Sequence, residues 1–597
     1  MASAQPILQS GGDQRTFFVD MGWRLGQLVP ARMTQPPDHA PTEGTEPAFS
    51  RAVRRGWALG RKTIVVALVL SCIVLISLYL RVPDYGFYED DYWAIVPFFK
   101  APVSELWDNT VSQFETWTQG RPLNHSFPMW FSRAGYGLGG VQGIYFLGFL
   151  VQSLNAFLFY LLLRKWLDHW SAILGGCLLI LLPADTTHIF IEHSAQLHTS
   201  VTCLLLALLI RRTRFWLLSY PIATLSLLSY ETPFLPFIVF PLFLVERKKR
   251  IFQWLIHLGI CSGVLLSVFG IRLLLSDSRA NSAVSQPGDT LWRMFSSLWI
   301  GPETSLKTLL RAVIQAPHSQ PPFAFLFAGL GIILLLLVPL LVRDADKDTP
   351  ASIRSHSVTI FFAGLASWIF SYVLTLINYP PAQMAGRLTS VHLAAVFGLA
   401  CAIAAATAYL RSFRDFRLKA AATGVASLMV AIFILYGFHI QSGFAAAWEM
   451  ERRFWQRVIQ LCPDITPNTR VILVGTEPRQ NEFILSNSWA DLLVLGNIFA
   501  WDSSPLFFYY NGLRATADFR FEKGQVTWKP FFWRDERETL NLGDVILLQD
   551  DGDDMTRISE FQIPEVPFPL HSKKLPPSQA HPSPSPLTVF GQFLLRP

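Results

Sequence analysis

Two adjacent acids, Asp90 and Asp91, are the residues of this sequence whose types and spacing most directly suggest chemistry. They follow the first strongly apolar segment and precede Gly120–Asn124 (Gly-Arg-Pro-Leu-Asn) by about 30 residues. Like charges push the pKa values of neighbouring carboxyls apart, so one can serve as a general base while the other faces a phosphate or a metal ion. A solvated loop or a helix cap explains the pair equally well. Glu89, one residue earlier, is expected to face solvent.

Aromatic residues flank the acidic pair, namely Tyr88, Tyr92 and Trp93. An aromatic face beside an acid suits the binding of a sugar ring. Aromatic residues also collect at membrane interfaces without any further function. Tyr92 is therefore a candidate binding residue on chemical type and position.

A second polar segment carries Asp185, His188, Glu192, His193 and His198. His188 and Glu192 are four residues apart, so on a helix they would share a face. A metal site is conceivable from these residue types. The favoured interpretation is a set of hydrogen-bonding residues that line a polar cavity.

Glu231 lies between two short apolar runs. An acid at membrane depth is a candidate functional residue by default. Pairing with an arginine in a structural role is the equal alternative.

The elements that must position these residues are membrane helices. Of the 597 residues, 51% are hydrophobic and only 15% are charged, against roughly 25% charged in ordinary soluble domains. Repeated apolar runs of 15–25 residues predict a polytopic α-helical membrane protein. About eleven spans are expected, near 63–80, 141–163, 169–184, 196–210, 215–229, 232–245, 252–275, 321–342, 357–377, 391–410 and 420–440.

Basic residues occupy alternate gaps between these spans, for example Arg164 and Lys165, and the run 247–250. The positive-inside rule makes those gaps cytoplasmic. The N-terminus is then cytoplasmic, with residues 1–60 largely disordered, and the C-terminus is exterior. A cleaved signal peptide is not expected, because no hydrophobic segment lies near Met1. None of the six cysteines is placed for a disulfide framework or a zinc site.

Three exterior segments are expected: 81–140, 276–320 and the tail from about 441. The middle one contains an amphipathic stretch, 291–299, suited to the membrane interface. A transmembrane domain is predicted over 61–445. The tail, 446–597, changes to strand-like runs at 471–475 and 544–549, which predict a small mixed α/β exterior domain. Its Pro/Ser-rich stretch near 576–586 is expected to be extended.

The order of motifs resembles the first loop and second helix of the polyprenyl-phosphate-sugar-dependent glycosyltransferases of the GT-C fold. The acidic pair is followed by Arg121-Pro122-Leu123 and by an aromatic-rich helix ending in Leu154–Leu158. Glu192 after Leu182-Pro183, and the run Leu227–Thr232, fit later motifs. The similarity covers about residues 60–250 and is greatest to the protein O-mannosyltransferase-like branch, without its tetratricopeptide repeats. Gly120 and Tyr230 depart from the pattern, where the family has an aromatic residue and a lysine.

The resemblance implies an integral-membrane, cell-envelope glycosyltransferase of GT-C-like fold. Its donor would be a polyprenyl-phosphate sugar, its acceptor an unidentified protein, lipid or glycan on the exterior face. No cofactor is certain, and a divalent metal is possible. The resemblance puts the catalytic base on Asp90 or Asp91. Arg387 is the candidate for the leaving phosphate because an arginine fork binds two phosphate oxygens; Arg272 is the next candidate, and Arg121 is expected to hold the loop or pair with an acid.

A non-enzymatic transporter or a polysaccharide polymerase of the cell envelope remains the alternative. A transporter is expected to contain internal repeats with discontinuous helices in matching halves, and none is evident. No dinucleotide-binding, P-loop or nucleophile-elbow motif of a soluble enzyme is present. Nothing in the sequence indicates a nucleic-acid partner.

Overall fold

The computed structural model describes residues 62–595 apart from several short gaps. The expectations for residues 1–60 and for the stretch near 576–586 fall outside the described residues. The gaps are 117–119, 245–249, 319, 342–349, 375–383, 476–480, 485–487, 500, 502–505, 511–517, 530–536, 552–553, 564–565 and 575–586.

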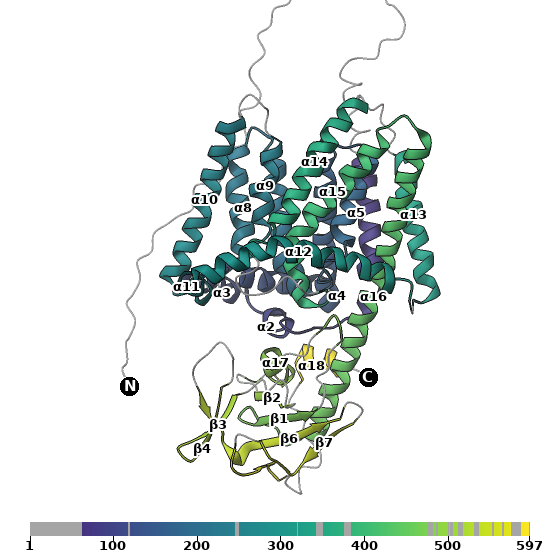
Figure 1. Cartoon of the computed structure of the whole chain (residues 1–597). Coiled ribbons are helices and arrows are strands. Elements are labelled where there is room, and N and C mark those ends of the chain that lie inside the picture. Colours follow the sequence, from purple (N-terminus) through teal and green to yellow (C-terminus); the bar gives the residue numbers. More distant parts are fainter. Residues whose placement is uncertain are drawn as a thin grey trace, which may run out of the picture. The chain divides into compact units, whose positions relative to one another are not determined.

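Helices occupy all eleven positions where spans were expected (Figure 1). Six of the described helices are long and apolar enough to cross a membrane by length and composition, so the chain is a multi-pass membrane protein. The six are Lys62–Asp84, Pro122–Leu163, Ile191–Ile210, Ile251–Leu274, Arg387–Arg411 and Phe416–Leu461. The other positions hold α5 (His169–Leu181), α8 (Ser219–Ser229), α9 (Phe234–Val239), α13 (Pro322–Leu341) and α14 (Pro350–Phe370). A total of eleven crossings stays a prediction.

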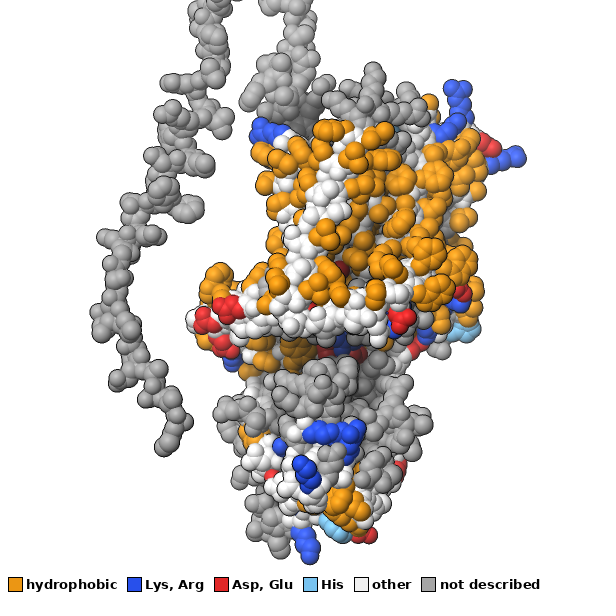
Figure 2. Space-filling model, turned by 60° about the vertical axis from the view of Figure 1, so that its left-hand side comes forward, with side chains coloured by type: hydrophobic (Ala, Val, Ile, Leu, Met, Phe, Trp, Pro, Cys, Tyr) orange, Lys and Arg blue, Asp and Glu red, His pale blue; other side chains and the backbone are white. Residues whose placement is uncertain are grey.

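Hydrophobic side chains cover the outward face of these helices in Figure 2, while charged side chains gather near the ends of the same face. Leu266 on α10 (Arg250–Leu274), Leu326 on α13 and Val425 on α16 (Phe416–Leu461) are each at least 70% exposed. A continuous apolar surface of this kind is unfavourable in water and suits contact with lipid.

The segment expected as the first exterior loop, 81–140, is largely helical. It contains α2 (Asp91–Ala94), α3 (Val103–Thr116) and the first part of α4 (Pro122–Leu163). The helix α4 changes direction at Gly139 and Gly140, and Gly140 has φ of 62°. A residue with a Cβ rarely adopts that conformation, so the glycine permits the kink. The expected membrane span, 141–163, begins directly after it.

The amphipathic stretch expected at 291–299 forms part of α12 (Pro287–Gln315), which runs across the ends of neighbouring helices in Figure 1. Trp292, Phe295 and Trp299 on its outer side are 69–74% exposed. Its inner side is made of small residues such as Gly301 and Ser305, both buried. Aromatic side chains on one side of a helix favour the membrane interface.

A long helix, α16, passes without interruption through residue 445, where the exterior domain was expected to begin. It leads into a four-stranded sheet of order β2-β1-β6-β7. The strands β1 (Arg470–Gly475), β2 (Leu506–Tyr510) and β6 (Val545–Asp550) are parallel, and β7 (Met555–Ile558) is antiparallel to β6. Both strands expected from the sequence are present. The small helices α17 (Ser488–Phe499) and α18 (Val589–Leu594) accompany this sheet, and the division into separate domains stays a prediction.

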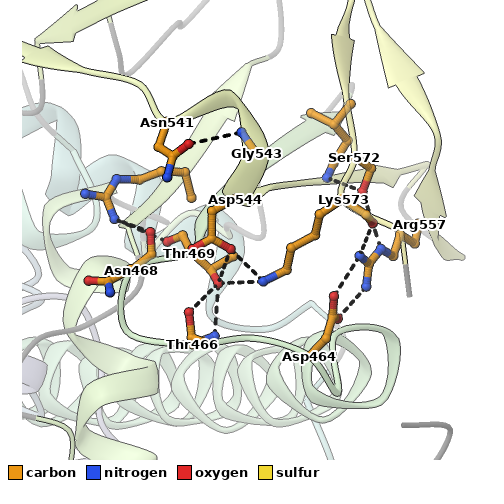
Figure 3. Close-up of polar contacts among 12 residues, drawn as sticks. Asp464, Thr466, Asn468, Thr469, Asn541, Gly543, Asp544, Arg557, Ser572 and Lys573 are labelled. Carbon is orange, nitrogen blue, oxygen red and sulfur yellow. Dashed lines mark hydrogen bonds and ion pairs between the residues drawn. The ribbon is translucent and has the colours of Figure 1, made fainter. Parts of the chain in front are cut away.

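One ion pair joins the chain just beyond α16 to the sheet, and a second joins Lys573 to Asp544, the residue before β6 (Figure 3). Asp464, just beyond α16, accepts two hydrogen bonds from Arg557 of β7, at 2.6 and 3.0 Å. Lys573 donates to Asp544 at 2.7 Å and to Thr469 at 3.0 Å. The two hydrogen bonds between the Arg557 guanidinium and the Asp464 carboxylate add geometric specificity as well as energy. The sheet therefore has a defined orientation at the end of α16.

Candidate functional site

Four acids and one arginine converge where the first loop meets the start of the span Arg387–Arg411. This group, the Arg387 cluster, consists of Glu89, Asp90, Asp91, Glu192 and Arg387. Arg387 begins the short helix η10 (Arg387–His392) and pairs with Asp90 and, at 3.4 Å, with Glu89. The expectation that Glu89 faces solvent is wrong, because Glu89 is only 5% exposed and turns into this cluster. It adopts φ of 47°, which is uncommon for a residue with a Cβ.

Asp91 has a different environment from Asp90. Its side chain is fully buried, and its two oxygens accept hydrogen bonds from the backbone N–H groups of Tyr88 at 3.1 Å and Glu192 at 2.9 Å. Burial raises the pKa of Asp91 to about 8, although both hydrogen bonds oppose the rise. Asp91 is therefore largely protonated at neutral pH and links the first loop to the helix that follows Phe190, whereas Asp90 is ion-paired.

Glu192 and His188 do not lie on one helix, contrary to the shared face expected from their spacing. His188 precedes the short helix α6 (Ile191–His193), which contains Glu192. The ring of His188 stacks on that of His198, with centroids 4.5 Å apart. Glu192 instead lies within the Arg387 cluster, where the charges of Arg387 and Asp90 act on its carboxyl group.

A second group, the Glu231 cluster, contains Arg121, Glu231 and Arg272. Glu231 accepts from Arg121 at 2.6 Å and from Arg272 at 2.8 Å, and each of the three side chains is less than 20% exposed. Burial alone would raise the pKa of Glu231, but the two guanidinium groups together hold it well below its usual range. The pairing with arginine expected for Glu231 and for Arg121 is confirmed.

Gly120 makes room for this arrangement. Its carbonyl accepts from two nitrogens of Arg272, at 3.2 and 2.8 Å. Gly120 has φ of 69°, and a Cβ placed on it would lie 2.1 Å from Arg272 Nε. A residue with a side chain at position 120 would therefore collide with Arg272, a link that the sequence pattern did not reveal.

The two clusters are neighbours. The guanidinium of Arg121 lies 4.7 Å from the ring centre of Tyr230, and the Tyr230 hydroxyl bonds to Ser390, three residues after Arg387. Trp93, just after the acidic pair, packs on His125 at the start of α4, with ring centroids 5.1 Å apart. Carboxylates and guanidinium groups therefore share one region of the molecule.

Tyr92 contacts the C-terminal helices α17 and α18. Its backbone carbonyl accepts from Asn497 of α17 at 2.7 Å, and its ring packs on Phe590 of α18. The side chain is 1% exposed. These contacts give Tyr92 a role in joining the first loop to the C-terminal helices, and a role in binding stays a prediction.

A third group, which we call the histidine cluster, contains Asp185, His188 and His198, all buried. It lines a small cavity together with Gln152 and Asn155 of α4. Gln152 was not singled out from the sequence. An uncharged amide within an otherwise apolar span was the signal, because polar side chains at membrane depth need partners.

Comparisons with known proteins give limited information. No family model and no curated protein matches the chain. Among solved structures, ArnT from Cupriavidus metallidurans bound to undecaprenyl phosphate is similar at 16% identity, over 70% of this chain and 82% of that one, with a TM-score of 0.29. The apo form of the same protein gives 15% identity, over 72% and 83%, with a TM-score of 0.27.

Proposed function

We propose that this protein is an integral-membrane glycosyltransferase that transfers a sugar from a polyprenyl-phosphate donor to an acceptor at the exterior face. The observation that carries the proposal is the adjacency of the two clusters, one rich in carboxylates and one rich in guanidinium groups. The reaction needs both kinds of group. A base takes the proton of the acceptor hydroxyl, and positive charge stabilises the phosphate that leaves when the bond from the sugar C1 to oxygen breaks.

Asp90 is the proposed base. Its carboxylate is paired with Arg387, which fixes the position of the side chain. Asp91 is unsuited to that role because its side chain is fully buried and both of its oxygens already accept backbone hydrogen bonds. Asp91 instead positions Asp90 through its backbone contacts with Tyr88 and Glu192.

The donor phosphate has two candidate sites. Arg387, the candidate from the sequence, already faces the carboxylates of Asp90 and Glu89, so a phosphate there would meet two negative groups. Arg121 and Arg272 face the single carboxylate of Glu231, which leaves an excess of positive charge. We therefore propose that Arg121 and Arg272 bind the phosphate, while Arg387 holds Asp90 in place.

Donor binding to purified variants separates the two sites. Arg272→Ala removes charge-assisted hydrogen bonds worth about 1.5–3 kcal/mol, so donor affinity should fall by roughly 10- to 150-fold. Arg272→Lys should recover only part of the loss, because the planar fork is absent. Arg387→Ala should leave donor binding near that of the wild type and lower turnover. Arg293→Ala, on the exposed side of α12, is the control.

The outcomes distinguish the sites clearly. Loss of donor binding in Arg387→Ala, with normal binding in Arg272→Ala, would show that Arg387 binds the phosphate. Normal binding in both variants would contradict a phosphate-linked donor at either cluster. Labelled polyprenyl-phosphate sugars, supplied one at a time to membrane fractions, identify the sugar.

Substitution of the proposed base tests the chemistry. Asp90→Asn keeps the shape of the side chain but removes its basicity, so turnover should fall by about 10²–10⁴ while donor binding persists. Glu105→Gln on the exposed side of α3 is the matched control. Sugar transfer at the wild-type rate by Asp90→Asn would exclude Asp90 as the base.

A further inference from the structure

The histidine cluster brings together three potential ligand atoms that are distant from solvent. One atom from each of Asp185, His188 and His198 lies within 4.8 Å of the others. The pair formed by His198 Nε2 and Asp185 Oδ2 is 3.8 Å apart, beyond hydrogen-bond distance. All three residues are at least 97% buried.

Several polar atoms of this site have no hydrogen-bond partner among the described residues. They are Asp185 Oδ2, His198 Nε2, and the Oε1 and Nε2 atoms of Gln152. All three residues line the same cavity of about 10 Å³, room for roughly one water molecule. Buried polar groups are almost always satisfied, so four such atoms at one cavity point to a bound species.

The chemistry of the donor set selects that species. Two imidazoles and a carboxylate suit Zn²⁺ or a related transition-metal ion, whereas Mg²⁺ and Ca²⁺ prefer oxygen ligands throughout. We propose that Asp185, His188 and His198 bind a divalent transition-metal ion, with Zn²⁺ the best fit. The fourth position is supplied by the Gln152 carbonyl oxygen or by a water molecule in the cavity.

The surroundings hold the ligands in position. Asp185 Oδ1 accepts from the backbone N–H and the hydroxyl of Thr187, at 2.9 and 2.7 Å, which leaves Oδ2 for an ion. The His188 carbonyl accepts from Tyr79 and Ser194, both at 3.0 Å. Hydrogen bonds around the ligands of a metal fix their orientation. Zinc bonds of about 2.0–2.1 Å place tetrahedral ligand atoms roughly 3.3 Å apart, so the present side chains need only a small inward movement.

The ion would connect the segment after α5 to the π-helical turn η5 (Ser194–His198). Thr186, next to Asp185, donates its backbone N–H to Thr389 and accepts from the backbone of Gly386, the residue before Arg387. The ion would therefore act as a positioning element for the Arg387 cluster. The proposal does not rest on the glycosyltransferase assignment.

Metal content tests the site directly. Untagged full-length protein is washed with a chelator, dialysed against Zn²⁺ and then against metal-free buffer, and measured by elemental analysis. We expect about one Zn²⁺ per chain in the wild type and in the control His318→Gln, whose histidine is exposed on the chain after α12. Asp185→Asn, His188→Gln and His198→Gln should each lose most of the ion. Loaded with Co²⁺, the wild type should show the visible absorption of a tetrahedral nitrogen and oxygen site.

A stability measurement on the wild type keeps the test independent of whether the variants fold. Zn²⁺ should raise the thermal midpoint of chelated wild-type protein, because an ion that binds only the folded state stabilises it, and Mg²⁺ should not. Absence of bound Zn²⁺ together with an unchanged midpoint would overturn the proposal. Equal metal content in the wild type and in folded ligand variants would overturn it as well.

Discussion

Asp90 and Asp91 are adjacent in the chain, yet their carboxyl groups meet different surroundings. Asp90 lies beside a guanidinium, and Asp91 lies between two backbone N–H groups in a fully buried position. The first environment places the Asp90 carboxylate in an ion pair with Arg387. The second keeps the carboxyl protonated near neutral pH, since burial raises the pKa of Asp91 to about 8. This difference supports the proposed division of roles, with Asp90 as the base and Asp91 as the positioning residue.

This difference predicts a pH dependence of stability. In the unfolded chain Asp91 loses its proton near its ordinary pKa of 3.8, whereas the folded protein keeps it to about pH 8. Between these values the folded state binds more protons, so the contribution of Asp91 to stability falls as pH rises. The thermal midpoint of the wild type should drop between pH 6 and about 8 more steeply than that of Asp91→Asn.

Asp84→Asn, whose side chain is 52% exposed, is the control and should keep the wild-type slope. Parallel curves for the wild type and Asp91→Asn would show that Asp91 is ionised in the folded protein.

The acidic pair and Arg387 were singled out separately from the sequence, Arg387 as the candidate for the donor phosphate, and their pairing was not predicted. Residue type and spacing place Asp90 and Asp91 after a helix. Burial and the partner of each oxygen depend on Arg387, about 300 residues away, and on Glu192. For the same reason the buried position of Glu89 was not foreseen. The pairing of Glu231 with arginine was foreseen in kind, because a buried charge needs a counter-charge.

At the scale of elements, the pair α14 and α15 (Leu393–Arg411) shows how helices approach each other in this protein. Gly364 and Gly398 face each other, and a Cβ on Gly398 would lie 2.2 Å from the backbone nitrogen of Trp368 and 2.6 Å from the carbonyl oxygen of Gly364. Small residues at helix contacts in membranes let the backbones approach and pack closely. Backbone atoms cannot move aside as a flexible side chain can.

Gly398→Ala should therefore separate the two helices and destabilise the fold by about 1–3 kcal/mol. The lower thermal midpoint in detergent reports this loss. Gly259→Ala on α10, where a Cβ meets nothing within 4 Å, should leave the midpoint unchanged or slightly raised. Equal midpoints for Gly398→Ala and the wild type would mean that the close approach is absent.

Element positions were predictable because apolar length alone sets where a membrane helix can lie. The helical content of 81–140 was not, since α3 has no long apolar run and the kink of α4 depends on Gly139 and Gly140. The strands β1 and β6 were found from their continuous apolar runs, as is typical of buried parallel strands.

At the scale of the whole molecule, the basic gaps between the helices predict the orientation in the membrane. Single cysteines at Ser104 and Gln525, introduced into a chain without the six native cysteines, should react in intact cells with a thiol reagent that does not cross membranes. A cysteine at Lys165 should react only after the cells are opened. All three positions are exposed, so reactivity reports the side of the membrane. Labelling at position 165 in sealed cells would reverse the orientation.

Because α16 is unbroken, it fixes how far the sheet is rotated about the helix axis relative to the membrane helices. Tyr88 bonds to the Phe444 carbonyl near one part of this helix, and Arg457 bonds to Asp554 near the other. One residue inserted between them turns everything beyond it by about 100° and advances it by about 1.5 Å. Seven inserted residues restore the angle to within about 20° but add about 10 Å. The number of residues between Phe444 and Arg457 therefore fixes both the direction in which the sheet faces and its distance from the acidic pair, which a flexible linker would leave variable.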